Sequence, residues 1–575
     1  MRTLMILLSG VLLVGCETHQ PFGDDLSVRL IAPLAGAGTG SPNSAVAGKP
    51  TLRWTSSSAA QTYQVQVDDS CDLVAPCTFP SPEIDDSAVA TTSYVPASPL
   101  VVSSTVPRRQ RYHWRVRACR DGSCGEWSSA RYFVVGQDLA INRDLNGDGY
   151  SDFLIGSPNS SAVLSQAGQA FVYLGGPRLP VRPALVINSD VPVDQLGHAV
   201  AVAGDVNGDG FGDFLVQTTG NNMSVGTQSG RVLLFFGGVN LKAQPDIKFA
   251  GGNVDDANGP MTGCGDLNGD GYDDIAFAAT DIDAQHQAIL PARVEIHFGG
   301  PAMATSAPLV LLGESATDFF GSSISAAGDV NGDGYPDLIV GSHQGVSGGR
   351  VRIYFGGSQM DATPDVILES PADAPVTGLF GYSVAGVGDV NGDGFADVAV
   401  GARDGNEFPA SLGRVYVYYG GSPPHTTPDL VFMGNYQDEY FGQAVVFAGD
   451  LNHDGYANIA VLARGIPTGE ADVAVGRTAT QGRVYFYLGG EHPIVSPVIE
   501  NGTAPITFPS SIRLAAFDID GDAEPEILTG QLANYGSSPV TGQVSIYQRS
   551  NNYAAPALTI SAASSDDWFG FALSR

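Results

Sequence analysis

Basic residues are scarce in this sequence of 575 residues, which holds 28 lysines and arginines against 60 aspartates and glutamates, a net charge of −32. Such a chain is repelled by nucleic acid and by anionic membrane surfaces, so neither is an expected partner. Long segments with helical apolar periodicity are also lacking, whereas the 73 glycines and 36 prolines are typical of a turn-rich chain. These features favour an all-β fold.

The common catalytic motifs are absent. The nine histidines form no HExxH pair and no Cys/His metal spacing, and no glycine-rich loop has the pattern that cradles phosphate. The segment GVSGG at 345–349 matches G-x-S-x-G, but it falls in an expected loop between strands and lacks the strand-turn-helix context of a nucleophile elbow. We therefore assign no catalytic residue and expect a protein that is not an enzyme.

Long hydrophobic runs are confined to the N-terminus, and no later segment is apolar enough to span a membrane. The first residues, MRTLMILLSGVLLVGC, have the short basic start and apolar run of a secretion signal. The end of this run, LVGC, resembles the bacterial lipobox. That resemblance implies a signal peptide at 1–15, a lipidated Cys16, a tether at 16–26 and attachment to the outer membrane or cell surface; the alternative is an ordinary cleaved signal.

Residues 27–136 contain no acidic repeat and have the pattern of short alternating strands. In the segment YHWRVRAC, one face carries Tyr112, Trp114, Val116 and Ala118, which predicts one buried sheet face. The order of an early tryptophan strand, this segment and a closing EWSSARYF resembles a fibronectin type III domain. The resemblance implies a small β-sandwich that serves as a spacer or as a second binding module.

Only six cysteines are present, and four of them lie in this region. In a secreted chain these four should pair, and we favour two local bridges, Cys71 to Cys77 and Cys119 to Cys124, over cross-pairing. Cys264 stays unpaired in this scheme and aligns with alanines of the repeats described next, so we expect a small buried core residue rather than a reactive thiol.

An acidic nine-residue segment recurs from residue 144 onward with near-constant spacing. The spacings between successive copies are 61, 61, 63, 60, 61 and 68 residues, which indicates a closed or stacked array of seven units. The copies are DLNGDGYSD at 144, DVNGDGFGD at 205, DLNGDGYDD at 266, DVNGDGYPD at 329, DVNGDGFAD at 389, DLNHDGYAN at 450 and DIDGDAEPE at 518.

Each unit has the same order of predicted strands around its acidic loop. A strand that opens with FG or a variant enters the loop, an apolar strand leaves it, and a GRVYVYYGG-like strand and a short fourth strand follow. Four strands per unit, repeated seven times, predict a seven-bladed β-propeller over 139–575. The FG opening together with the acidic loop resembles the FG-GAP repeat of integrin α-subunits. This resemblance implies an integrin-like, ligand-binding propeller that is extracellular.

The two ends of the array are incomplete in complementary ways. The first acidic loop has no FG strand before it, and the last FG strand, near Phe569, has no acidic loop after it. We therefore expect the C-terminal strand to supply the innermost strand of the first blade, which closes the ring and removes two sheet edges.

The acidic loops have the donor pattern of calcium sites. Oxygen side chains at positions 1, 3, 5 and 9, with the backbone carbonyl of position 7, suit an ion that takes six to eight oxygens, and glycine at position 6 allows the bend. An EF-hand would require Glu at position 12, where the first loop has Ile155 inside a strand. The predicted ligands of the five full matches are Asp144, Asn146, Asp148, Tyr150, Asp152; Asp205, Asn207, Asp209, Phe211, Asp213; Asp266, Asn268, Asp270, Tyr272, Asp274; Asp329, Asn331, Asp333, Tyr335, Asp337; and Asp389, Asn391, Asp393, Phe395, Asp397.

The last two loops depart from this pattern, so weaker calcium binding is expected there. The sixth has His453 for glycine and Asn458 for the final aspartate, and the seventh has Ala523 for glycine. The alternative for every loop is an acidic turn without metal. The predicted ligands in these two loops are Asp450, Asn452, Asp454, Tyr456, Asn458, Asp518, Asp520, Asp522 and Glu526.

Taken together, these features favour a monomeric, lipid-anchored and calcium-stabilised propeller that binds an extracellular protein or glycan. A polysaccharide-acting, lyase-like enzyme and a purely structural envelope component are the alternatives. Because every innermost strand runs from its FG end to its acidic end, the metal loops share one face, and we expect ligand binding on the other. The candidate binding residues there are His343, Arg403, Tyr436, Arg464, Arg477 and Trp568.

Overall fold

The computed structural model describes most of the strands and many of the loops of the chain. The described residues are 30–32, 52–54, 57, 60–69, 79–98, 100, 110–128, 131–135, 142–219, 230–250, 259–279, 291–315, 317–344, 348–372, 379–403, 412–434, 440–452, 454, 456–464, 482–490, 493, 506–508, 513–522, 524–533, 541–551, 553, 555–561 and 568–574. Within these ranges the only helix is the 3-10 turn η4 (Arg549–Asn551), so none is long and apolar enough to cross a membrane.

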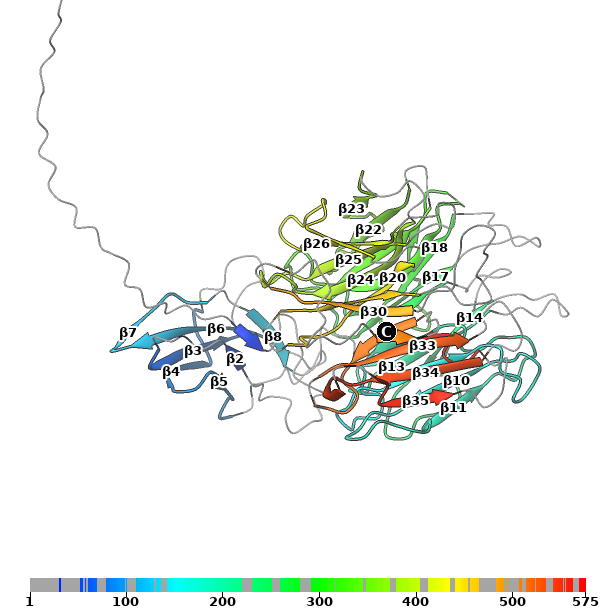
Figure 1. The fold of residues 1–575 in the computed structure, drawn as a ribbon, viewed down its shortest axis with the longest axis horizontal. Coiled ribbons are helices and arrows are strands. Elements are labelled where there is room, and N and C mark those ends of the chain that lie inside the picture. The colour runs from blue at the N-terminus through cyan, green and yellow to red at the C-terminus, as the bar shows by residue number, and fades with distance from the viewer. Residues whose placement is uncertain are drawn as a thin grey trace, which may run out of the picture.

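A small sandwich of two antiparallel sheets lies beside the larger body (Figure 1). Trp54, Tyr112 and Trp114 fill its core with almost no exposed surface, as the alternation in YHWRVRAC predicts. One sheet is β1 (Leu30–Ala32), β2 (Leu52–Trp54) and β5 (Ser93–Tyr94); the other is β4 (Ile84–Val89), β3 (Thr62–Asp68), β6 (Gln110–Arg120), β7 (Ser123–Cys124) and β8 (Arg131–Val135).

Seven four-stranded antiparallel sheets follow among the residues that the structure describes, as the repeat predicts. From the innermost strand outward, the first three are β36 (Ala572–Leu573), β9 (Phe153–Ser157), β10 (Gln169–Tyr173), β11 (Leu185–Asn188); β12 (Val200–Gly204), β13 (Asp213–Thr218), β14 (Arg231–Phe235), β15 (Ile247–Ala250); and β16 (Met261–Gly265), β17 (Asp274–Ala279), β18 (Arg293–His297), β19 (Leu309–Leu312). The fourth and fifth are β20 (Phe320–Gly328), β21 (Asp337–Ser342), β22 (Arg350–Tyr354), β23 (Val366–Glu369); and β24 (Phe380–Gly388), β25 (Asp397–Ala402), β26 (Arg414–Tyr418), β27 (Leu430–Met433). The last two are β28 (Phe441–Phe447), β29 (Ile459–Ala463), β30 (Gly482–Tyr487), β31 (Ile506–Phe508); and β32 (Arg513–Phe517), β33 (Glu526–Ala533), β34 (Thr541–Tyr547), β35 (Leu558–Ser561).

The second strand of each sheet is buried on both faces, because neighbouring blades pack against it. Strands β13, β17, β21 and β25 are buried along their whole length, and this explains their continuous apolar sequences. The cores form between blades: Phe432 of the fifth blade stacks on Tyr487 of the sixth with ring centroids 3.8 Å apart. Cys264 is a buried free thiol in one of these cores, as expected from the alignment.

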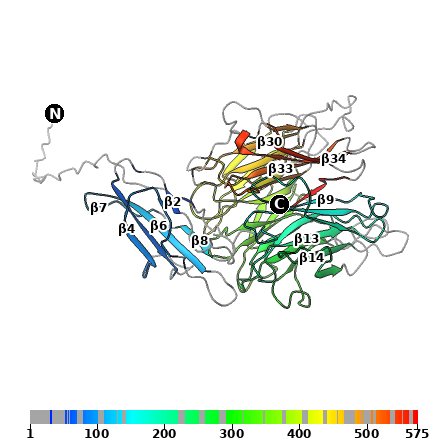
Figure 2. The ribbon, with the colours of Figure 1, turned by 90° about the horizontal axis from the view of Figure 1, so that it is seen from below.

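The C-terminal strand β36 completes the first sheet, so the prediction of ring closure is confirmed. Ala572 pairs with Gly156 and Leu573 with Ile155. The amide of Ser574 donates to the carbonyl of Leu154 at 3.2 Å, and its hydroxyl accepts from the amide of Leu154 at 3.0 Å. The first and last parts of the propeller therefore lie side by side, and the C-terminus lies near the middle of both views (Figures 1 and 2).

Candidate metal loops and the cluster on the opposite face

The first acidic loop is organised by its own carboxylates. Asp144 at position 1 accepts hydrogen bonds from the amides of Gly147, Asp148 and Gly149 at 2.7, 3.1 and 2.8 Å. At position 9, Asp152 accepts from the amide of Leu145 at 2.8 Å and from that of Gly175 at 2.7 Å. The backbone thus directs these carboxylates inward, and position 9 links the loop to the turn after the third strand.

The same bonds recur in the other full matches. The position-9 carboxylates of Asp213, Asp274, Asp337 and Asp397 each accept two backbone amides at 2.7 to 2.9 Å. One amide belongs to position 2 of the same loop, and the other to the first glycine of the GG pair that follows the third strand. This repetition shows that position 9 also has a structural task, whether or not a cation is bound.

The position-9 carboxylates are buried among neutral donors. Burial raises the pKa of Asp152 to about 8, and the two backbone hydrogen bonds offset this only in part. Burial likewise raises the pKa of Asp213, Asp274 and Asp397 well above the usual value. No lysine or arginine of the described residues forms an ion pair with these carboxylates. A bound cation would supply the missing positive charge.

The two divergent loops keep this geometry despite their substitutions. Asn458 accepts the amide of Leu451 at 2.7 Å, and Glu526 accepts that of Ile519 at 2.7 Å. In the seventh loop, Asp518, Asp520 and Asp522 bring one carboxylate oxygen each to within 4.8 Å of one another. The position-3 oxygens of both loops, Oδ1 of Asn452 and Oδ1 of Asp520, are buried and accept no hydrogen bond from the described residues.

Successive loops touch through one glycine and one aromatic ring. A Cβ on Gly147 at position 4 would lie 2.6 Å from Cε1 of Phe211, the position-7 residue of the next loop. The contact recurs around the ring between the pairs Gly208 and Tyr272, Gly269 and Tyr335, Gly332 and Phe395, Gly392 and Tyr456, and Gly521 and Tyr150. The sequence rules out this contact only between the sixth and seventh loops. His453 replaces the position-4 glycine of the sixth loop, and Glu524 replaces the position-7 aromatic residue of the seventh. The acidic loops therefore lie side by side on one face.

These loops fit calcium better than other ions. Their donors are carboxylate, amide and carbonyl oxygens, with three carboxylates in each full match, and the orphaned oxygens of Asn452 and Asp520 show spare acceptor capacity. Magnesium is less suited, because it keeps its waters and rarely uses cages built from protein alone.

A second group of side chains gathers where three innermost strands begin, at the FG ends of blades four to six. The ring of His343 lies 4.9 Å from that of Phe319 and 5.5 Å from that of Tyr382. The guanidinium of Arg403 lies over Tyr382 at 4.2 Å and over Tyr440 at 5.1 Å from the ring centroids. We call these five residues the FG-end cluster.

Two of the cluster residues were predicted, and three were not. Arg403 and His343 are among the binding residues predicted from the sequence, and so is Arg464, whose guanidinium lies 5.7 Å from the ring centroid of Tyr440. Phe319, Tyr382 and Tyr440 were missed, although each stands directly before or after an FG pair. Of the remaining candidates, Trp568 lies across the ring seam beside Phe571, with ring centroids 5.6 Å apart. Tyr436 and Arg477 are outside the described residues.

Of the two predicted disulfides, only one lies among the described residues. Cys119 and Cys124 form the expected local disulfide, at the turn between β6 and β7. Cys16, Cys71 and Cys77 lie outside the described residues.

The FG-GAP repeat family matches four stretches of the chain, at residues 136–173, 196–235, 320–354 and 380–418. These stretches contain the first, second, fourth and fifth acidic loops. The chain therefore carries FG-GAP repeats on a propeller of seven four-stranded sheets.

Curated relatives of the repeat region are integrin α-subunits. Integrin alpha-5 of Xenopus laevis is 36% identical over 171 residues, which is 27% of this chain and 16% of the integrin. Integrin alpha-8 of Mus musculus is 31% identical over 257 residues, 42% of this chain and 21% of the integrin. The chain thus spans about a fifth or less of the length of these relatives.

A rhamnogalacturonan lyase of Bacillus licheniformis aligns with 88% of this chain and 89% of its own, at 12% identity and a TM-score of 0.28. At this score the likeness carries no argument about fold or activity.

Proposed function

We propose that this protein is an envelope-anchored, calcium-stabilised propeller that binds an extracellular protein or glycan through its FG-end face. The observation that carries the proposal is the separation of the two faces. The acidic loops line one face in a ring, and the FG-end cluster gathers arginine and aromatic side chains at the other end of the same strands. Arginine and tyrosine dominate binding hot spots.

In this proposal calcium has a structural role. The ligands predicted for each loop hold the ion, from positions 1, 3, 5, 7 and 9 in the first six loops and from positions 1, 3, 5 and 9 in the seventh, with five full sites and two weaker ones. The ion neutralises the buried carboxylates, and the residues of the loop position the neighbouring blade through the glycine and aromatic contacts. The chain's own groups fix the loop backbone, since positions 1 and 9 already accept its amides.

Extracellular placement and ligand binding are proposed by analogy with the integrin relatives, and anchoring rests on Cys16 and its lipobox-like setting. The fibronectin type III-like character of the sandwich belongs to the same proposal, with the sandwich acting as a spacer or a second binding module.

The test is a combined glycan and protein array probed with residues 26–575 in calcium, together with a lyase assay that follows absorbance of unsaturated products. Specific binding that Ala substitutions at Arg403 or Phe319 weaken without changing the thermal melt is the expected result. Turnover of a polysaccharide would replace the binding proposal by an enzymatic one. A complete lack of binding would contradict it.

A further inference from the structure

Arg403 forms no ion pair with a carboxylate among the described residues. It follows β25 directly, at the FG end between blades five and six. Its Nη1 donates to the hydroxyl of Tyr382 at 3.2 Å and to Oε1 of Gln443 at 2.9 Å, both neutral acceptors. Its Nε is buried and has no hydrogen-bond acceptor among the described residues.

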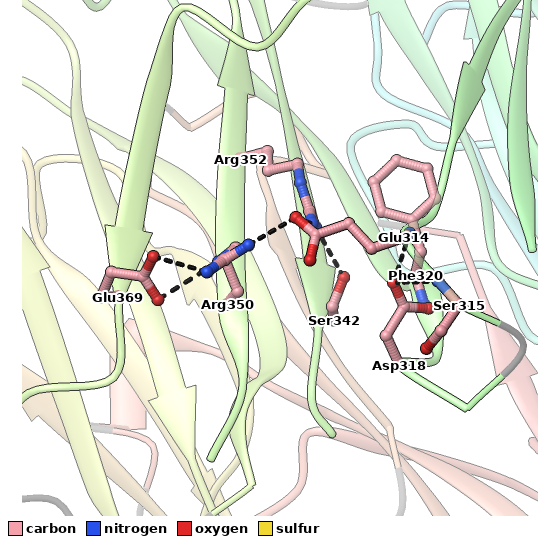
Figure 3. A network of polar contacts seen from close by, with 8 residues as sticks. All are labelled: Glu314, Ser315, Asp318, Phe320, Ser342, Arg350, Arg352 and Glu369. Atoms are coloured by element: carbon pink, nitrogen blue, oxygen red, sulfur yellow. Dashed lines mark hydrogen bonds and ion pairs between the residues drawn. The ribbon is translucent and has the colours of Figure 1, made fainter. Parts of the chain in front are cut away.

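The neighbouring blade shows the alternative arrangement. There Arg350 pairs with Glu314 and Glu369, and Arg352 donates to Glu314 at 2.7 Å and to Ser342 at 2.9 Å (Figure 3). Figure 3 shows the two carboxylates and the two guanidinium groups directed toward one another along the sheet. The charges of these arginines are thus satisfied within the protein.

The chain has 60 acidic and 28 basic residues, yet none of the acidic residues that the structure describes pairs with Arg403. The hydrogen bonds of Arg403 hold Nη1, and the edge formed by Nε and Nη2 has no acceptor among the residues that the structure describes. This is the edge that a carboxylate binds with two parallel hydrogen bonds. A buried donor that lacks an acceptor is costly, so its presence calls for an explanation such as a ligand.

The rest of the cluster supplies flat aromatic surface and no negative charge. Phe319 is 48% exposed and packs against His343. His343 in turn contacts Tyr382, whose ring lies under the guanidinium of Arg403. Burial, and then the charge of Arg403, lowers the pKa of His343 to about 4, so its imidazole is neutral near neutral pH. The cluster therefore offers a fixed positive charge beside apolar ring faces, and none of its five members is acidic.

We infer that the FG-end cluster recognises a uronic acid unit of an extracellular glycan, with the sugar carboxylate on Arg403 and an apolar face of a sugar ring on the aromatic side chains. This deepens the proposed function and rests on it. A pyranose with a carboxyl group combines one planar anion with a flat C–H face, which matches the two chemistries present. An acidic peptide side chain offers the anion without the ring.

The experiment uses full-length protein in calcium-containing buffer and two matched ligands. These are a uronic acid oligosaccharide, tested in several ring configurations, and the same oligosaccharide with its carboxyl groups reduced to hydroxymethyl groups. Calorimetry should show binding of the acid form, and binding of the reduced form that is weaker by at least about tenfold.

The variants separate local recognition from net charge. Arg403→Met should weaken binding of the acid form by at least about tenfold. Arg350→Met removes the same charge from a paired arginine outside the cluster and should leave the affinity unchanged. Phe319→Ala should also weaken binding, with an unchanged thermal melt.

Equal affinity for the reduced oligosaccharide, or equal losses in Arg403→Met and Arg350→Met, would overturn the inference. So would an acidic peptide that binds through Arg403 while the uronic acids do not. If the array finds a neutral glycan or a protein instead, this inference fails and the proposed function stands. If no ligand binds at all, both fail.

Discussion

The ring of Tyr150 covers the backbone of Gly521 across the seam between the first and seventh blades, where a Cβ on Gly521 would lie 2.6 Å from Cε1 of Tyr150. These two residues are 371 positions apart in the sequence, yet they repeat the contact made by five other pairs of consecutive loops. The position-7 residue, whose carbonyl is proposed to bind the calcium of its own loop, thus packs on the backbone of the preceding loop. Order in one loop is therefore coupled to order in its neighbour.

This contact predicts that position 4 requires glycine for two reasons: the positive φ of its backbone, and the lack of space for a Cβ beside the aromatic ring. Gly392 has φ of 80°, and a Cβ there would lie 2.5 Å from Cε1 of the buried Tyr456. Gly394 has φ of 96° with nothing within 4 Å of the added Cβ. Both alanine variants should lose about 1 kcal/mol through the unfavourable φ. Gly392→Ala should lose about 1–3 kcal/mol more through overpacking.

Denaturant unfolding in saturating calcium measures the difference between these two variants. Equal losses in Gly392→Ala and Gly394→Ala would show that the aromatic contact contributes nothing.

Much of the architecture could be predicted from the sequence because each blade is encoded by one contiguous repeat. The spacing of the acidic loops, the four strands of each unit and the role of Phe569 in closure all follow from one chain segment at a time. The FG-end cluster could not be predicted in full, because its side chains come from three blades: Phe319 and His343 from the fourth, Tyr382 and Arg403 from the fifth, and Tyr440 from the sixth. The one sequence feature that points to these residues is their position beside an FG pair. The sequence alone does not show which of the side chains beside the FG pairs come together.

Removal of calcium should destabilise the propeller and spare the sandwich. Chelation leaves the three predicted carboxylate ligands of each full loop without a counter-ion, and each site contributes about 2.7 kcal/mol when free calcium exceeds its Kd a hundredfold. Thermal melts with and without EGTA should therefore show one transition that falls and one that stays. Transitions unmoved by the chelator would contradict the metal assignment.

The metal-free propeller should lose stability as the pH rises. Burial raises the pKa of Asp205 to about 6, and those of Asp152 and Glu526 to about 8. A carboxyl group whose pKa is raised in the folded state adds to the free energy of unfolding. This contribution is fully present below the pKa of the unfolded chain, near 4, and is lost as the pH rises through the pKa of the folded state. The loss should therefore extend from about pH 4 to about pH 8.

Protein that has been stripped of metal and exchanged into chelator-free buffer is unfolded with urea at pH 5 and pH 8 for this test. Calcium competes with the protons, so its affinity should rise over the same range, and saturating calcium should remove most of the loss. Metal-free protein that is more stable at pH 8 than at pH 5 would contradict the assigned burial of these carboxyls.

Deletion of residues 566–575 should open the ring. Phe569 and Leu573 are 4% and 5% exposed in the core at the seam, and without β36 the first blade presents an unpaired inner edge. The variant should melt at a lower temperature and elute partly as aggregate in size-exclusion chromatography. Deletion of residues 17–26 is the control of equal length, and similar behaviour of both truncations would argue against closure as a source of stability.

Replacing Asn458 by aspartate should have opposite effects with and without calcium. Asn458 is fully buried at position 9 of the sixth loop and accepts the amide of Leu451 at 2.7 Å, as the aspartates of the full loops do. In calcium the added carboxylate completes the ligand set, so the melting temperature should rise. In metal-free protein at pH 8 it becomes a buried charge without a cation and should cost about 1–3 kcal/mol.

The reverse change, Asp397→Asn in the fifth loop, should lower the melting temperature in calcium and raise it in metal-free protein. Shifts of the same sign in both conditions would mean that position 9 acts only through its backbone hydrogen bonds.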